Sequence, residues 1–187
     1  TLGDLARHHA LVRPDSEVFW FEGQGTTYGA FDRLTNQIAN GLRAEGLTNG
    51  SRVAFMDKNS DAFYQIVFGA AKANTVSVGI NWRLAPPEVA YILNDSRAEI
   101  LFVGPDFFAL AAGILSTVPT LRRVVAMSPG YPEWTEFTRW RDQFPDSDPG
   151  IPVSTEDVAI QMYTSGTTGH PKGVQLQQRC FFDLWRN

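Results

Sequence analysis

One stretch of this sequence combines the residue types that bind a polyphosphate. It reads Tyr-Thr-Ser-Gly-Thr-Thr-Gly-His-Pro-Lys-Gly-Val and covers residues 163–174. Its glycines let the backbone turn sharply and approach a ligand closely, and consecutive backbone N–H groups in such a turn form an anion-binding nest. The hydroxyl side chains add neutral donors, and Lys172 adds a positive charge that can follow a moving phosphate. The segment is therefore predicted to bind phosphate groups.

Two widespread phosphate-binding motifs do not match this stretch. A Walker A loop has glycine before its lysine and Ser or Thr after it, whereas Pro171 and Gly173 flank the lysine here. The dinucleotide fingerprint G-x-G-x-x-G also fails, because two threonines separate Gly166 from Gly169. These mismatches disfavour a kinase or GTPase of the P-loop kind. A plain Gly/Thr-rich surface turn is the remaining alternative, and the length of the run, ending in Pro-Lys-Gly, argues against it.

The elements that position this loop follow from the hydrophobic pattern. Short apolar runs typical of buried strands alternate with helical patterns, which predicts an α/β fold with a mainly parallel sheet and helices on both faces. The predicted strands cover residues 18–21, 52–56, 76–80, 100–103, 124–127 and 158–162. The predicted helices cover residues 28–45, 61–72 and 107–115, with another beginning at residue 86.

Several helix ends have recognisable signals. Thr27 and Ser60 stand where N-cap residues are expected, and Gly46 stands where a helix end favours positive φ. Pro86 begins its helix at a position where the missing N–H does no harm. The helix over 61–72 is apolar on most faces, so we expect it to be largely buried.

Residues 128–156 interrupt this alternation. They are richer in Pro, Gly and Asp than the rest of the chain, which predicts an irregular connector. A short helix within residues 134–144 is expected there. The last strand, 158–162, then leads directly into the phosphate-binding stretch.

Composition excludes several classes of protein. The chain has 187 residues, 43% of them hydrophobic and 12% aromatic, which is ample material for a buried core. The net charge is −4 and no segment concentrates Lys and Arg, so we expect no nucleic-acid partner. No apolar run approaches the roughly 18 residues of a transmembrane helix, and no signal peptide is evident. Oligomeric state is not predicted.

Single residues outside the loop give weaker signals. Cys180 is the only cysteine, so neither an intrachain disulfide nor a cysteine metal site can form, and a reducing, cytoplasmic compartment is expected. We expect Cys180 to be a buried helix residue and His170 to be a solvated loop residue. Asp57, Asp95 and Asp106 stand near predicted element ends, where Asp serves caps and turns. We predict neither a catalytic carboxylate pair nor a metal site from them.

Residues 163–173 resemble the signature phosphate loop of the adenylate-forming superfamily, which includes acyl- and aryl-CoA synthetases, peptide-synthetase adenylation domains and beetle luciferases. Weaker similarity covers nearly the whole chain, including the amphipathic segment 27–46 and Gly-Ser-Arg-Val-Ala at 50–54. The resemblance implies that residues 1–187 are the N-terminal portion of an AMP-binding domain. It also implies a partial copy of the large N-terminal domain of the acyl-CoA synthetase-like fold.

The family's reaction has two steps. A carboxylate attacks the α-phosphate of ATP to give an acyl-adenylate and pyrophosphate, and a thiol, normally coenzyme A, then displaces AMP. The resemblance implies ATP, Mg²⁺ and coenzyme A as cofactors or co-substrates, and assigns the loop to the β- and γ-phosphates. Lys172 is the candidate catalytic residue. The candidate cofactor-binding residues are Thr164, Ser165, Gly166, Thr167, Thr168, Gly169 and Lys172.

The substrate subtype rests on a second region. Asn-Trp-Arg-Leu at 81–84 and the pattern of Glu, Tyr-Ile-Leu and Asp-Ser within 88–96 are similar to fatty-acyl-CoA ligases, so a fatty acid is the expected substrate. The chain departs from the family after the loop. Gln177, Gln178 and Cys180 stand where Ser or Thr, His and often Asn are usual, which leaves chain-length preference open.

Family members are longer, and their later motifs supply the adenine pocket, the Mg²⁺ and ribose ligands, the hinge and a mobile C-terminal domain. We therefore expect residues 1–187 alone neither to adenylate an acid nor to form a thioester. An aryl-CoA ligase or a peptide-synthetase adenylation domain is the alternative within this chemistry. A non-catalytic nucleotide-binding protein, or a phosphotransferase that releases ADP, is the alternative outside it.

Overall fold

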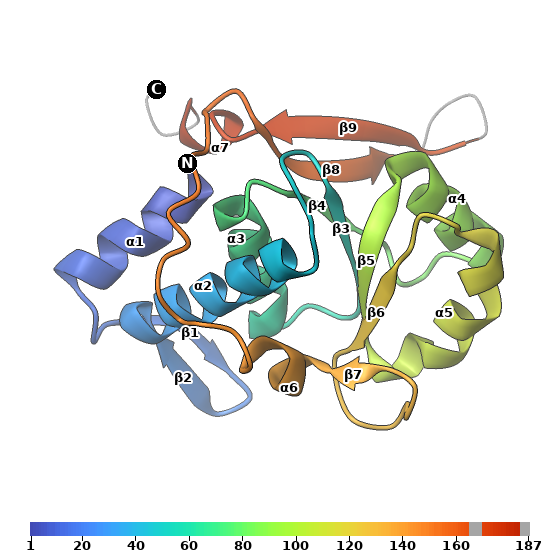
Figure 1. Ribbon diagram of the computed structural model, residues 1–187, viewed down its shortest axis with the longest axis horizontal. Helices are drawn as coiled ribbons and strands as arrows, with labels where there is room; N and C mark the ends of the chain where they lie inside the picture. The colour runs from blue at the N-terminus through green and yellow to red at the C-terminus, as the bar shows by residue number, and fades with distance from the viewer. Residues whose placement is uncertain (165–169, 184–187) are drawn as a thin grey trace.

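A seven-stranded sheet forms the centre of the protein (Figure 1). The computed structural model describes residues 1–164 and 170–183. The strands of the sheet are β3 (Arg52–Met56), β4 (Val76–Gly79), β5 (Ala98–Val103), β6 (Arg123–Ala126), β7 (Thr135–Glu136), β8 (Val158–Thr164) and β9 (Lys172–Gln177). Their order is β7-β6-β5-β3-β4-β8-β9, and only the β8–β9 pair is antiparallel among the described strands of this sheet. The predicted α/β fold with a mainly parallel sheet is confirmed.

Helices cover both faces of the sheet, as predicted. One face packs against α2 (Tyr28–Ala44), α3 (Asp61–Lys72) and α6 (Phe137–Arg141), and α1 (Leu2–Val12) packs on α2 and α3. The other face packs against α4 (Pro86–Ser96) and α5 (Phe108–Ile114). Short helical turns occur at η1 (Pro105–Phe107), η2 (Leu115–Thr117) and α7 (Cys180–Asp183). None of the described helices combines the length and apolarity needed to cross a membrane.

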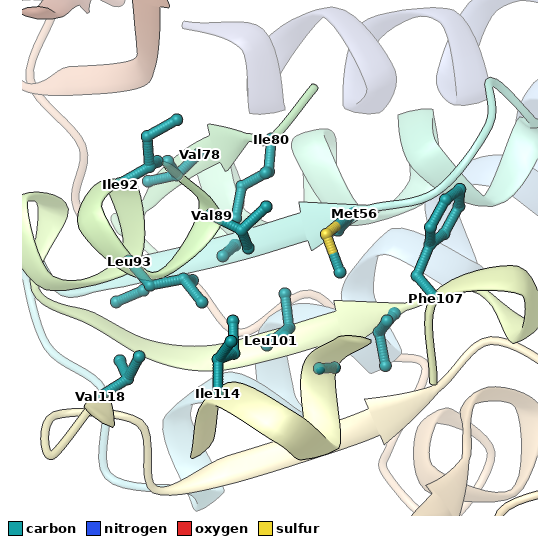
Figure 2. Packing of buried hydrophobic residues seen from close by; sticks show 14 of the residues in the cluster. Met56, Val78, Ile80, Val89, Ile92, Leu93, Leu101, Phe107, Ile114 and Val118 are labelled. Carbon is teal, nitrogen blue, oxygen red and sulfur yellow. The ribbon is translucent and has the colours of Figure 1, made fainter. Parts of the chain in front are cut away.

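The core on the α4–α5 face is built from alternate residues of the strands. Val89 and Leu93 of α4 meet Leu101 of β5, and all three side chains are fully buried (Figure 2). Because successive strand residues point to opposite faces, the neighbouring Phe102 faces the α2–α3 side and belongs to the second core cluster. The continuous apolar runs in the sequence thus reflect strands that are buried on both faces.

The helix ends follow the local signals. The hydroxyls of Thr27 and Ser60 accept bonds from Ala30 N and Phe63 N, at 3.3 Å each. Gly46 has φ of +84°, and Leu47 N bonds to Leu42 O at 3.1 Å, which is a Schellman ending. The predicted caps are therefore confirmed.

The first predicted strand is not part of the main sheet. β1 (Glu17–Phe21) pairs with β2 (Gln24–Thr27) in a separate antiparallel hairpin. Its turn consists of Glu22 and Gly23, which both have positive φ, as a two-residue type I′ turn requires. The backbone hydrogen bonds of β1 are therefore made with the adjacent segment and not with a strand of the main sheet.

Residues 128–156, before β8, include one short strand and one short helix. These are β7 and α6, and α6 is shorter than the helix expected within 134–144. The helix begins late because the Glu136 carboxylate accepts bonds from Thr138 N and Arg139 N, at 2.9 and 3.0 Å, and so acts as its N-cap. Trp140 of α6 is almost fully buried, with its ring edge-on to Phe102.

The prediction that Cys180 is buried is wrong. Cys180 begins α7 but its side chain is exposed. The neighbouring Phe181 packs instead against the small cluster of Leu2, Ala71 and Ala159. In so short a helix only one of two adjacent residues can face inward, and the larger apolar side chain does so.

A buried polar cluster fixes the crossing of α2 and α3. Lys72, at the end of α3, has no exposed surface, and its Nζ donates to Asp32 Oδ1 and Asn36 Oδ1, at 2.6 Å each. Asn36 Nδ2 in turn donates to the carbonyl of Asp146 at 2.9 Å. The cluster therefore links two helices to the segment that leads to β8.

Replacing Gly69 with alanine is expected to destabilise the protein by about 1–3 kcal/mol. A Cβ at this position of α3 would lie 2.5 Å from Ile38 Cγ2 and 3.2 Å from the carbonyl of Thr35, so α2 would have to move. Chemical denaturation measures the loss. Gly113→Ala on α5 is the matched control, because a Cβ there meets nothing within 4 Å, and it should be neutral or stabilising. Equal effects of the two substitutions would contradict this account of the helix crossing.

Candidate functional site

The predicted phosphate loop connects two antiparallel strands. Thr164 is the last residue of β8 and Lys172 the first residue of β9, and the two are direct partners across the hairpin. Both are exposed. Ser165, Gly166, Thr167, Thr168 and Gly169 lie outside the described residues. The structure thus brings together the first and last of the seven predicted binding residues.

The hairpin begins next to the point where the chain connections change direction. β3 continues into α3 on one face of the sheet, whereas the adjacent β4 continues into α4 on the other. Ligands of open parallel sheets bind outside the carboxyl ends of the strands at such a switch point. Since β8 runs parallel to β4 and lies beside it, its carboxyl end delivers Thr164 to this edge of the sheet.

A cavity of about 770 Å³ lies beside the hairpin. Its lining is mainly apolar, and Thr164 and Pro171 form the side next to the loop. The other residues that line it come from α3, β4, β8, and α4 with its preceding loop; they are Phe63, Val67, Ser77, Gly79, Asn81, Leu84, Glu88, Ile92, Ile160, Met162 and Tyr163. The described ends of the predicted phosphate loop therefore lie next to a mainly apolar cavity.

Buried polar atoms accompany this cavity. Ser77 is 2% exposed and its hydroxyl has no hydrogen-bond partner among the described residues. Gln161 on β8 is also buried, and its Nε2 donates to Tyr163 Oη at 2.9 Å. Neither residue was singled out from the sequence, because an isolated Ser or Gln in an apolar strand gives no signal of its own.

The hydroxyl of Tyr163 links β8 to α4 at the base of the hairpin. Its hydroxyl donates to Asp95 Oδ2 at 2.6 Å. Burial, together with the Asp95 carboxylate, raises the pKa of the Tyr163 hydroxyl, so it remains a protonated donor throughout the physiological range. Asp95 lies in the last turn of α4, near an element end as expected, but its carboxylate accepts this bond from a residue that is distant in sequence.

His170 lies just after the undescribed part of the loop. Its side chain is exposed, as expected, but its ring also stacks on Tyr91 of α4, with centroids 4.9 Å apart and planes inclined by 23°. The sequence could have indicated this side of α4, because Glu88, Tyr91, Ile92 and Asp95 recur at helical spacing and so share one face.

The site does not include protein ligands for a metal ion in the part of the chain that the structure describes. No group of three or more His, Cys, Asp and Glu side chains within residues 1–164 and 170–183 is arranged to hold one. The carboxylate of Asp106, near the end of β5, forms an exposed ion pair with Lys58 at 2.6 Å.

Comparison with known proteins agrees with this arrangement. Residues 6–185 match the family described as AMP-binding enzyme. A fatty acid–[acyl-carrier-protein] ligase of Streptomyces coeruleorubidus is 39% identical over 98% of this chain and 34% of its own length. Long-chain-fatty-acid–CoA ligase FadD13 of Mycobacterium tuberculosis is 37% identical over 92% of this chain and 34% of its own. The chain thus spans about a third of the length of these relatives.

Solved structures show the same fold. The anthranilate CoA ligase AuaEII, in complex with anthranoyl-AMP, superposes with a TM-score of 0.91 at 29% identity, over 95% of this chain and 35% of that one. The N-terminal domain of FACL13 from Mycobacterium tuberculosis gives 0.88 at 27% identity, over 99% of this chain and 46% of that one. The match over almost the whole chain, in sequence and in fold, shows that the protein belongs to the AMP-binding enzyme family of adenylate-forming ligases.

Proposed function

We propose that the protein activates a carboxylic acid with ATP and transfers the acyl group to a thiol. In the first step a carboxylate oxygen bonds to the α-phosphorus of ATP, and the bond from that phosphorus to the bridging oxygen breaks, releasing pyrophosphate. In the second step the thiolate sulfur bonds to the acyl carbon and AMP leaves with the electron pair. The observation that supports this most is the pairing of Thr164 with Lys172 at the base of an unbroken adenylate-type loop.

The loop acts on the leaving group in this proposal. Charge accumulates on pyrophosphate as the bond to the α-phosphorus breaks, and a fixed cation and N–H or O–H donors stabilise it more in the transition state than in the ground state. Lys172 supplies the cation, and Thr164 and the residues between them supply donors. Mg²⁺ would share the phosphate charge when bound, but the described residues offer no set of ligands for it, so we assign it none.

We propose a fatty acid as the substrate. The apolar cavity beside Thr164 favours an apolar acid over a polar one, and two of the relatives act on fatty acids by name. An aromatic acid is the second candidate, because a feruloyl-CoA synthase of an Amycolatopsis species is 35% identical over 94% of this chain and 33% of its own length.

Carboxylate-dependent exchange of pyrophosphate into ATP tests the first step. The assay uses the full-length protein with fatty, aromatic and amino acids in parallel. We expect exchange with fatty acids, since exchange requires only the adenylation half-reaction. Exchange with aromatic acids alone would replace the substrate proposal, and no exchange with any acid from the folded protein would contradict the function.

The thiol acceptor is tested separately. Coenzyme A is the proposed acceptor, while the relative with 39% identity uses an acyl-carrier protein by name. Thioester formation from a preformed acyl-adenylate distinguishes the two. Coenzyme A and a pantetheinylated carrier protein are supplied in turn at equal concentration, and the acceptor with the higher kcat/KM is assigned.

A further inference from the structure

We propose that Tyr163 is a positioning residue, which Asp95 and Gln161 hold in place so that the base of the β8–β9 hairpin, and with it Thr164 and Lys172, is fixed against α4. The inference rests on the proposed function for what the loop binds. It adds a role for residues that lie outside the phosphate-binding set.

The first observation is that α4 contacts the hairpin at both ends of the loop. Tyr163 directly precedes Thr164, and its hydroxyl lies 2.6 Å from Asp95 Oδ2. His170, two residues before Lys172, stacks on Tyr91. Tyr91 and Asp95 are four residues apart, so they stand one above the other on the same face of α4. One helix face therefore contacts the residues on both sides of the undescribed segment.

The second observation is the unfavourable position of Asp95. It lies in the last turn of α4, where the helix dipole disfavours a negative charge, and that turn has no basic residue. A neutral hydroxyl donor offsets part of this cost, because hydrogen bonds to charged acceptors are stronger than those between neutral groups. An acid at this place is better explained by the Tyr163 bond than by helix stability.

The third observation concerns Gly173, the direct partner of Tyr163 on β9. Its φ is not positive, so backbone freedom does not explain the glycine. A Cβ there would lie 2.7 Å from Gln161 Nε2 and 3.2 Å from Tyr163 Cζ. The glycine that ends the Pro-Lys-Gly sequence thus leaves the space in which the Gln161 and Tyr163 side chains meet.

Tyr163→Phe in the full-length protein tests the proposal, with Tyr64→Phe as the matched control. Tyr64 is an exposed residue of α3 outside the cavity lining, so the same hydroxyl is removed away from the hairpin. We expect Tyr163→Phe to raise the KM for ATP about tenfold, which corresponds to a hydrogen bond of about 1.4 kcal/mol. The KM for the acid should change less than twofold, about 0.4 kcal/mol, and Tyr64→Phe should behave as wild type. Asp95→Asn keeps an acceptor and should lose less than Asp95→Ala.

Hydrogen–deuterium exchange supplies a readout that does not require turnover. We expect the amides of residues 158–164 and 172–177 to exchange faster in Tyr163→Phe than in Tyr64→Phe, while the rest of the sheet is unchanged. Unchanged hairpin protection, or a lower melting temperature with an unchanged KM for ATP, would overturn the proposal. If the wild type catalyses no ATP–pyrophosphate exchange, the proposed function fails. The hydrogen–deuterium exchange of the hairpin amides then decides alone whether Tyr163 fixes the hairpin against α4.

A compensating pair adds a second test. Gly173→Ala should raise the KM for ATP, because its methyl group displaces Gln161 and Tyr163. Adding Gln161→Ala removes the closest clash, so the double variant should be no worse than Gly173→Ala alone. Additive losses would mean that Gly173 and Gln161 act independently, which would overturn the role given to Gly173.

Discussion

Replacing Lys172 with alanine is expected to lower the rate of adenylation by about 10- to 1,000-fold. The side chain stands at the start of β9, exposed and directly across the hairpin from Thr164. Its positive charge is the only one between residues 158 and 178. Its loss removes the cation that would stabilise the departing pyrophosphate. Pyrophosphate exchange at saturating ATP measures the effect, which should fall on kcat more than on the KM for the acid.

Two further variants make this result specific. Lys172→Arg keeps the charge and should retain more activity than Lys172→Ala, although the planar guanidinium does not reproduce an ammonium. Lys58→Ala removes an exposed lysine that pairs with Asp106 and does not line the cavity, and it should leave the rate unchanged. A wild-type rate in Lys172→Ala would remove the loop from the mechanism.

Much of the fold could be predicted because its signals are local. Thr27 and Ser60 cap helices through bonds to residues three positions ahead, so the residue type and a short pattern suffice. The parallel sheet was predicted for a similar reason, because a strand that is buried on both faces has a continuous apolar sequence of its own. The β1 strand was also recognised, but its partner β2 was not, because its residues Gln-Gly-Thr-Thr form no apolar run that would indicate a strand.

The candidate site was predictable in its chemistry but not in its surroundings. Thr164 and Lys172 could be proposed as phosphate-binding residues because the loop is one continuous sequence. Asp95 could not, because its hydrogen bond to Tyr163 joins residues 68 positions apart. Ser77 and Gln161 can be recognised as neighbours of the site only once β4 and β8 are known to lie side by side. Residues that act through long-range contacts therefore need the structure to be found.

Lys72 is fully buried although it stands in the last turn of α3, where a lysine is ordinarily exposed, and removing it should have a large effect on stability. Lys72→Ala is expected to lower the free energy of unfolding by about 3–5 kcal/mol, as for other buried ion pairs that lose one partner. The ammonium bonds to Asp32 and Asn36, and α1 covers its stem, since a Cβ at Gly3 would lie 3.0 Å from Lys72 Cγ. The alanine variant would leave both a cavity and a carboxylate without its cation.

A second substitution separates the charge from the packing. Lys72→Met fills the space of the stem but leaves Asp32 unpaired, so it should still destabilise the protein. Adding Asp32→Asn removes the unpaired charge and should restore part of the stability, because a buried pair is replaced by groups of similar volume. Denaturant midpoints of the three variants give the comparison. If the double variant were less stable than Lys72→Met, the unpaired Asp32 charge would not be the cause of the loss.

The same residue predicts a pH dependence with a definite sign. Burial lowers the pKa of Lys72 below its ordinary value of 10.5. Between the lowered value and 10.5 the unfolded chain binds more protons than the folded one, so the free energy of unfolding contributed by this group rises with pH in that window. Lys72→Met abolishes this contribution. The stability difference between wild type and Lys72→Met should therefore grow in favour of the wild type as the pH approaches 10.5, and a difference that shrinks would mean that the Asp32 ion pair, rather than burial, dominates the titration of Lys72.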